Sequence, residues 1–199
     1  MMQPAAMLDL EVYHRNTTSL QRIRTAQWHV LYRHLYSDIL KNGMAILMVE
    51  MLQKTVTEPE QNPELFSFCE ACLHWLDRSN DQKLIALFPL YFSLHLTHFF
   101  GFRIPQPSSE VQEKKPLYLN LQEGLFTNQV PQHAFYLEGN MAYQLAELLK
   151  VLHPDELGEI ACSAAERSGM LDALLLYYRQ HVPNFGEIRS LQIIRTILR

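Results

Sequence analysis

Residues 83–100 constrain the fold most strongly, because apolar residues occur almost all the way round when this stretch is wound as a helix. A helix without a polar face has to be covered on every side, so it needs other elements around it. Pro89 either kinks this helix or marks its true start, since proline lacks the backbone donor that a helix interior uses. Both interpretations predict a buried central helix. Its apolar residues are Leu84, Ile85, Leu87, Phe88, Leu90, Tyr91, Phe92, Leu94, Leu96 and Phe99.

Helical periodicity continues on both sides of this stretch. Apolar residues recur on one face of 37–55, and Ser37 is placed to cap the first turn. Asn62 and Pro63 provide an N-cap and a first-turn proline for a second helix, which ends near Arg78. The fold class is therefore expected to be mainly α, with about six to eight helices. A later helix is expected from after Gly139 to around Pro154, and a last group at roughly 155–166, 170–181 and 189–198.

The N-terminal segment has the period of a strand. Apolar residues alternate with other residues over 8–14, as in a half-exposed strand. Residues 15–19 are polar and turn-forming, and 20–28 is interpreted as the second strand of a hairpin, although its apolar spacing of three also fits a helix. An isolated hairpin is marginal in water, so it needs more strands or a helical surface. We expect a sheet fragment at 1–30, followed by a helical domain at 31–199.

The segment from 102 to 137 is expected to be a loop or irregular part of the helical domain. Prolines at 105, 107 and 116 and the charged run 110–115 are typical of exposed connections. The following residues, 117–132, fit short strands or turns equally well.

The composition indicates a folded chain, because 48% of the residues are hydrophobic and 19% are charged. No run of about 18 uncharged apolar residues suggests a membrane span, and the N-terminus lacks the basic start and apolar run of a signal peptide. Three cysteines are too few for a disulfide framework, which agrees with a reducing compartment. A cytoplasmic protein with no membrane partner is expected.

The net charge of −4 argues against a hold on nucleic acid by the whole surface, so DNA binding would need a local patch. The predicted hairpin concentrates cations and stackable rings, which single-stranded nucleic acid binding needs. Alternatively, these residues only solvate the outer face of a sheet. They are Arg15, Arg22, Arg24, Tyr13, Trp28 and Tyr32.

A second basic group lies near the C-terminus. Its members either contact phosphates or complement the C-termini of helices, where the helix dipole is negative. They are Arg179, Arg189, Arg195 and Arg199.

Two pairs of side chains are suited to metal or redox chemistry. Cys69 and Cys72 form a CxxC motif in the middle of a predicted helix, without a second pair for zinc, which favours buried thiols. His95 and His98 lie three apart on the central helix, and packed histidines are favoured over a metal site because no further ligands are nearby. The sequence has no phosphate loop, GxSxG or HExxH motif. We expect no enzyme, metal or cofactor; an enzyme built around His95 and His98 is the least favoured hypothesis.

Several short motifs occur in the same order as in a known bacterial family. They are LDLEVYHR at 8–15, LQRI at 20–23, NPELF at 62–66, WLD at 75–77, FFGF at 99–102, YYRQH at 177–181 and FGEIRSL at 185–191. In this order they resemble the RecO family of DNA repair and recombination mediator proteins, in the form found in Bacteroidetes. The resemblance extends over nearly the whole chain.

The resemblance implies that the hairpin is the last two strands of an OB-fold that is truncated at its N-terminus, and such a barrel normally has five strands. It implies a mediator that binds single-stranded DNA and single-stranded DNA-binding protein, works with RecR, and assists RecA loading or strand annealing near the bacterial nucleoid. The alternative is a helical protein-interaction module without DNA binding, because two strands cannot close the barrel. Some members carry a cysteine zinc site after the central helix, but residues 103–137 contain no cysteine.

The same resemblance implies residues for each partner. The DNA-binding candidates are Arg15, Arg22, Arg24, Arg179 and Arg189. Members of the family bind the acidic, phenylalanine-ending tail of single-stranded DNA-binding protein, which needs an apolar pocket rimmed by a cation. The candidates for this tail site are Phe88, Phe92 and His95, with Lys83 as the cation; core packing is the alternative role of the two phenylalanines.

Overall fold

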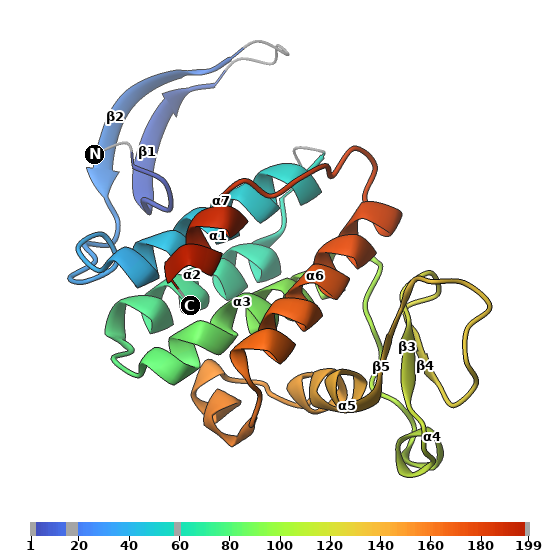
Figure 1. Cartoon of the computed structure of the whole chain (residues 1–199). Coiled ribbons are helices and arrows are strands. Elements are labelled where there is room, and N and C mark those ends of the chain that lie inside the picture. The colour runs from blue at the N-terminus through green and yellow to red at the C-terminus, as the bar shows by residue number, and fades with distance from the viewer. Residues whose placement is uncertain (1–2, 15–19, 58–60, 198–199) are drawn as a thin grey trace.

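The computed structural model describes residues 3–14, 20–57 and 61–197 (Figure 1). Within these residues there are seven α-helices, two 3-10 helices and two small antiparallel sheets, which confirms the mainly α fold with an N-terminal hairpin. The elements are β1 (Leu8–Tyr13), β2 (Arg22–Trp28), α1 (Ile39–Thr55), α2 (Pro63–Arg78), α3 (Gln82–Leu96), η1 (Thr97–Phe100), α4 (Ser109–Glu113), β3 (Tyr118–Asn120), β4 (Leu125–Thr127), β5 (Tyr136–Glu138), α5 (Gly139–Leu148), η2 (Pro154–Glu159), α6 (Ala164–His181) and α7 (Ser190–Ile197).

The α3 helix forms the centre of the molecule. It packs against α1, α2, α6 and η2, and Phe88 and Phe92 in its middle are 1% and 0% exposed. Asp81 caps the helix by accepting hydrogen bonds from backbone N–H groups of its first turn. The helix therefore runs through Pro89, and the alternative start near that residue is wrong. The segment Gln82–Phe100 is long and apolar enough to cross a membrane, but 67% of its most apolar window is buried inside this protein.

A capping side chain precedes the first residue of both α1 and α2. Asn62 accepts a hydrogen bond from the N–H of Leu65, as expected, and Pro63 follows it as the first helical residue. In α1 the cap is Asp38, not Ser37, because the Asp38 carboxylate accepts from the N–H groups of the first turn. Ser37 instead donates its hydroxyl to a backbone carbonyl in the preceding turn.

A buried carboxylate joins the connection between β2 and α1 to α2. Asp77 accepts hydrogen bonds from the backbone N–H groups of Arg33, His34 and Leu35, at 2.7–3.1 Å. Desolvation by burial opposes ionisation, but these hydrogen bonds outweigh it and hold the pKa of Asp77 below its ordinary value. The buried Lys41 donates to the Asp77 carbonyl and thereby ties α1 to the end of α2.

The segment at 102–137, expected to be irregular, contains a small sheet with the strand order β4-β3-β5. Leu119, Phe126 and Leu137 are partners across the three strands, and they pack into the main core. Each strand has only three residues, which is too short for a period of two to be recognised in the sequence.

The C-terminal helices differ from the expected boundaries at one place. The helix expected at 155–166 is instead the 3-10 helix η2 followed by a connection, and α6 begins at Ala164, so the helix expected at 170–181 extends back through Gly169. Ser163 and Glu166 form a capping box that starts the helix, with Met170 and Leu171 buried after the glycine. Burial of the residues beyond the glycine outweighs its weak helix propensity.

The last helix is held against the first by one side chain. Glu50 of α1 accepts hydrogen bonds from the N–H of Arg189 and from the N–H and hydroxyl of Ser190, at the start of α7. Although burial opposes ionisation, these bonds and nearby Lys54 lower the pKa of Glu50. The negative charge also lies at the positive end of the α7 dipole.

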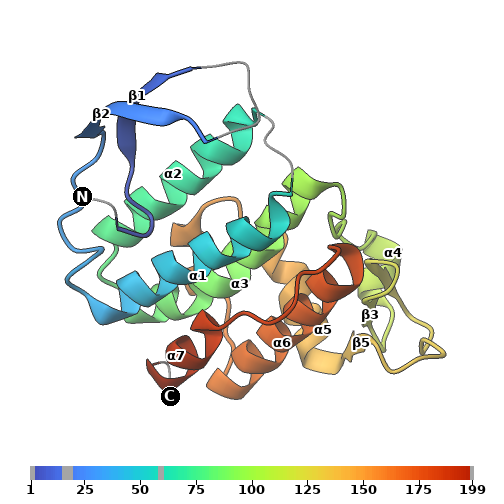
Figure 2. The same ribbon diagram turned by 90° about the horizontal axis from the view of Figure 1, so that it is seen from above.

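The hairpin lies to one side of α1, beside α2, whereas α6 and α7 lie on the other side (Figure 2). It contains a β-bulge, because Glu11 pairs with Thr25 and Val12 with Ile23, which leaves Arg24 as the additional residue. The apolar face of the hairpin is open to solvent: Leu10, Val12 and Ile23 are 49%, 44% and 43% exposed.

Candidate functional sites

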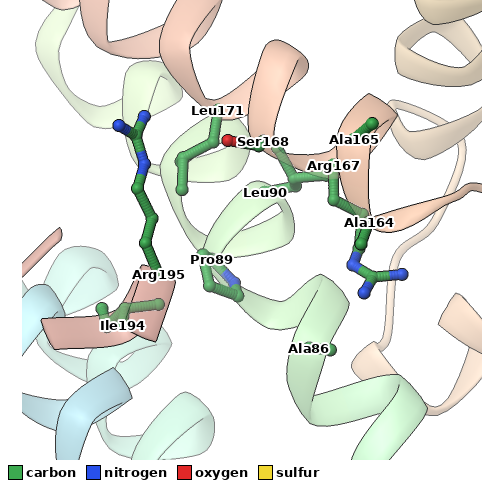
Figure 3. Close-up of a pocket in the computed structure, with 10 residues that line it drawn as sticks. All are labelled: Ala86, Pro89, Leu90, Ala164, Ala165, Arg167, Ser168, Leu171, Ile194 and Arg195. Atoms are coloured by element: carbon green, nitrogen blue, oxygen red, sulfur yellow. The ribbon is translucent and has the colours of Figure 1, made fainter. Parts of the chain in front are cut away.

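A cavity of about 350 Å³ opens between α3, α6 and α7 (Figure 3). Its apolar surface comes from three helices that are far apart in the sequence. On the opposite sides of the cavity lie two arginines, Arg167 from α6 and Arg195 from α7. The remaining residues that line it are Ala86, Pro89, Leu90, Ala164, Ala165, Ser168, Leu171 and Ile194.

Both arginines bind neighbouring groups but keep donors for a ligand. Arg167 donates from Nη1 to the carbonyl of Cys162 at 3.2 Å. Arg195 donates from Nη2 to Asp172, while its Nε–H is buried without a hydrogen-bond partner among the described residues. An arginine carries five N–H donors, so each guanidinium has donors beyond these contacts. The cavity therefore combines an apolar surface with fixed positive charge, which suits a ligand that has an apolar group beside a carboxylate.

The four residues expected to form the tail site do not lie in this cavity. Phe88 and Phe92 point into the interior, where Phe88 stacks on Trp75 and Phe92 on Phe68, with ring centroids 5.4 and 5.6 Å apart. Their alternative role, core packing, is the one that the structure gives them. Lys83 is exposed near the start of α3. No local pattern in the sequence marks the cavity, because its walls meet only in the folded chain.

His95 is largely enclosed by aromatic rings. Its ring centroid is 4.4 Å from that of Tyr91, and its Nε2 is buried without a hydrogen-bond partner among the described residues. Desolvation by burial lowers the pKa of His95 to about 4, so the ring is neutral at physiological pH. It therefore supplies no positive charge for an acidic ligand.

The arginines of the hairpin are not equivalent. Arg22 pairs with Tyr13 across the two strands, and both side chains are exposed, so a cation and a ring lie next to each other. Arg24 donates to Glu11 at 2.6 Å, so its charge is partly neutralised. Arg15 lies outside the described residues.

Arg179 belongs to α6 and Arg189 immediately precedes α7, and these two helices lie on the other side of α1 from the hairpin (Figure 2). Arg179, near the end of α6, donates from Nε to the carbonyl of Gly186 at 3.2 Å. Arg189 is exposed just before α7, and its backbone N–H is bound by Glu50. The four DNA-binding candidates within the described residues therefore do not form one continuous patch.

The cysteines and histidines form no metal site among the residues that the structure describes, where no group of three or more potential ligands comes together. The three cysteines are free thiols, with Cys72 buried. Burial raises the pKa of Cys69 to about 12 and that of Cys72 further, so neither is a reactive thiolate.

A second cavity, of about 530 Å³, lies between α2 and residues 152–155. Its polar residues are of mixed charge, with Glu70 and Asp155 beside Arg78 and two histidines. The Trp75 indole N–H donates to Asp155 at 2.7 Å across it. Mixed charge of this kind does not define a ligand class, in contrast to the arginine-flanked cavity.

Fold and cavity together define a mainly helical protein with an arginine-flanked apolar pocket and a short, largely exposed β-hairpin. The family model for the C-terminal part of recombination protein O matches residues 36–191. Among curated proteins, the chain is similar to DNA repair protein RecO of Christiangramia forsetii, with 30% identity over 99% of this chain and 78% of that protein. It is also similar to DNA repair protein RecO of Flavobacterium psychrophilum, with 28% identity over 98% of this chain and 77% of the relative.

RecO of Bacteroides fragilis is 26% identical over 98% of this chain and 78% of its own length. No solved structure matches this chain. The chain belongs to the RecO family of DNA repair proteins, as its motifs indicated.

Proposed function

We propose that this protein is a recombination mediator, which binds single-stranded DNA and single-stranded DNA-binding protein and, with RecR, assists RecA loading or strand annealing in the bacterial cytoplasm. Its membership of a family of DNA repair proteins supports this role. The mediator acts by binding alone, so no residue is assigned to the breaking or forming of bonds.

The arginine-flanked cavity is proposed as the site for the acidic tail of single-stranded DNA-binding protein. A tail that ends in phenylalanine presents an aromatic ring next to a terminal carboxylate. The ring fits against Leu90, Leu171 and Ile194, and the carboxylate is within the reach of an arginine at the edge. This pairing of apolar surface with two arginines is the observation that carries the proposal, and it replaces Phe88 and Phe92 as the tail-binding residues. Exposed Lys83 remains a candidate for contact with the acidic part of the tail.

The polar face of the hairpin is proposed as the DNA-binding surface. Tyr13 and Arg22 lie side by side there, a ring for base stacking and a cation for phosphate. Arg15 and Arg24 belong to the same proposal, with Arg24 contributing less because of its bond to Glu11. Arg179 and Arg189 would bind phosphates separately, on the other side of α1.

The tail site is tested by titration with a fluorescent peptide that has several acidic residues and a C-terminal phenylalanine. Ala165→Glu introduces a negative charge at an exposed position of the cavity wall, and we expect about ten-fold weaker binding because like charges repel. Ala165→Gln is the matched control, since it has the same size without the charge. A peptide with a C-terminal amide should also bind more weakly. Equal binding of all three proteins would contradict this site.

The DNA site is tested by titration with a labelled single-stranded oligonucleotide over a salt series. We expect Tyr13→Ala to weaken binding, because stacking contributes about 1–3 kcal/mol per base. Arg22→Gln should weaken binding and reduce its dependence on salt, because fewer counterions are released. Peptide binding with no DNA binding by the wild type would favour the alternative, a protein-interaction module.

A further inference from the structure

We propose that Asp172 is an internal competitor for the ligand of the arginine-flanked cavity, and so determines how tightly that cavity binds carboxylates. This inference rests on the function proposed above. Asp172 lies on α6, next to Leu171 of the cavity wall, and accepts a hydrogen bond from Nη2 of Arg195 on α7. The Asp172 carboxylate is thus already bound to the guanidinium that a ligand carboxylate would bind.

The contact between Asp172 and Arg195 is open to exchange. The two side chains are 56% and 41% exposed, and exposed ion pairs are weak because water screens them. Asp172 is also the one hydrogen-bond partner of the Arg195 guanidinium among the described residues. An incoming carboxylate therefore has only a weak bond to replace.

A second donor on the same edge of the guanidinium has no partner. The Nε–H of Arg195 is buried and has no hydrogen-bond partner among the described residues. A buried donor without a partner is unfavourable, and the Nε and Nη donors of an arginine are spaced to bind one carboxylate through two parallel bonds. A ligand carboxylate would satisfy Nε, whereas Asp172 binds through Nη2 alone.

Two carboxylates at one guanidinium repel each other, so Asp172 weakens every carboxylate ligand by a similar factor. A ligand offsets this loss only if it also buries an apolar group against Leu90, Leu171 and Ile194. An acidic peptide without an apolar end therefore binds more weakly than one that has such an end. Asp172 acts on the ligand through Arg195, and so sets the affinity of the cavity for carboxylates.

The test compares Asp172→Asn with the wild-type protein, using the phenylalanine-ended acidic peptide and the same peptide ending in glycine. We expect Asp172→Asn to bind both peptides about two- to five-fold more tightly at low salt, the range set by an exposed ion pair. Its affinity should also fall more steeply with salt. In the wild type one ion pair is exchanged for another, whereas in the variant a new one forms without loss.

Two further variants serve as controls. Asp172→Glu keeps the charge and should bind like the wild type. Glu187→Gln removes one negative charge at an exposed position outside the cavity, and should leave both affinity and salt dependence unchanged. If Glu187→Gln strengthened binding as much as Asp172→Asn, the effect would come from net charge, and the proposal would be overturned.

Arg195→Gln separates this inference from the proposed function. If Arg195→Gln and Ala165→Glu bind the peptide as the wild type does, the cavity is not the tail site and both proposals fail. If these two variants lose binding but Asp172→Asn gains none, the tail site stands and the role of Asp172 is overturned. Weaker binding by Asp172→Asn would also overturn it, because that result would mean that Asp172 only holds α7 in place.

Discussion

The hairpin and the helices around α3 use apolar residues in opposite ways. In α3 the apolar side chains are buried on all sides, and Phe92 is 0% exposed and stacks with the rings of Phe68 and Phe88. In the hairpin, Leu10, Val12 and Ile23 form an apolar face that remains open to solvent. Burial of apolar surface is the main favourable term in folding, so stability must come from the helical part.

The hairpin therefore depends on the helical part for its stability more than the helical part depends on the hairpin. A two-stranded hairpin is marginal in isolation. Its position therefore relies on residues 33–35, which connect it to α1 and whose backbone N–H groups donate to Asp77 of α2. The helical part does not need the hairpin for its core. Substitutions in the two regions should therefore have effects of very different size.

The largest contrast is expected between Phe92→Ala and Val12→Ala. Phe92→Ala leaves a cavity at the centre of the core and should lower the free energy of unfolding by about 3–5 kcal/mol. Val12→Ala removes apolar surface that is already half exposed, so its effect should be several times smaller. Chemical denaturation followed by circular dichroism measures both. Similar losses for the two variants would break the comparison.

A smaller loss, of about 1–3 kcal/mol, is expected for Asp77→Asn, because three backbone donors lose a charged acceptor. Asp9→Asn on the exposed hairpin is the matched control and should have little effect. Because the pKa of Asp77 is lowered in the folded protein, its contribution is present above the unfolded pKa of about 3.9 and is lost as pH falls through the folded value. The wild type should therefore lose more stability than Asp77→Asn below about pH 4, as denaturation curves would measure.

The attachment of α7 should respond locally to Glu50→Ala. The substitution leaves the N–H groups of Arg189 and Ser190 without their acceptor, and the expected loss is about 1–2 kcal/mol. Hydrogen exchange should speed up in α7 while α3 stays protected. Equal acceleration in both helices would show that α7 belongs to the same cooperative unit as the core.

The smallest effect is expected for Arg24→Ala on the hairpin. Arg24 and Glu11 are both more than half exposed, and such pairs contribute little to stability. Thermal unfolding should not distinguish the variant from the wild type. A clear fall in melting temperature would show that the bulge at Arg24 matters for the fold as a whole.

Local signals in the sequence predicted many of the elements correctly. The cap at Asn62, the proline at 63 and the apolar periodicity of 83–100 act within a few residues of the structure they specify, so α2 and α3 were predictable. Two predicted helix starts were wrong, the cap at Ser37 and the start at residue 170, because the local signal there did not select a single position. Ser37 and Asp38 are both good caps, and Gly169 weakens a helix that burial then restores.

The binding sites were predictable only in part. The sequence could indicate that Tyr13 and Arg22 belong to a hairpin, because strand pairing over a short turn is local. It could not indicate that Phe88 and Phe92 face inward while Pro89 and Leu90 line a cavity. The helix is apolar all the way round, so its sequence does not show which face meets which neighbour.

The sequence by itself determined the helical class, the central position of α3 and the family, since these depend on periodicity and on the order of short motifs. The tertiary structure alone decided which side of α3 meets α6 and α7, and hence that Arg167 and Arg195 flank one cavity while Asp172 binds Arg195. Arg195 lies 23 residues from Asp172, and no local rule relates the two positions. They meet because Glu50 holds the start of α7 against α1, a contact between residues 140 positions apart.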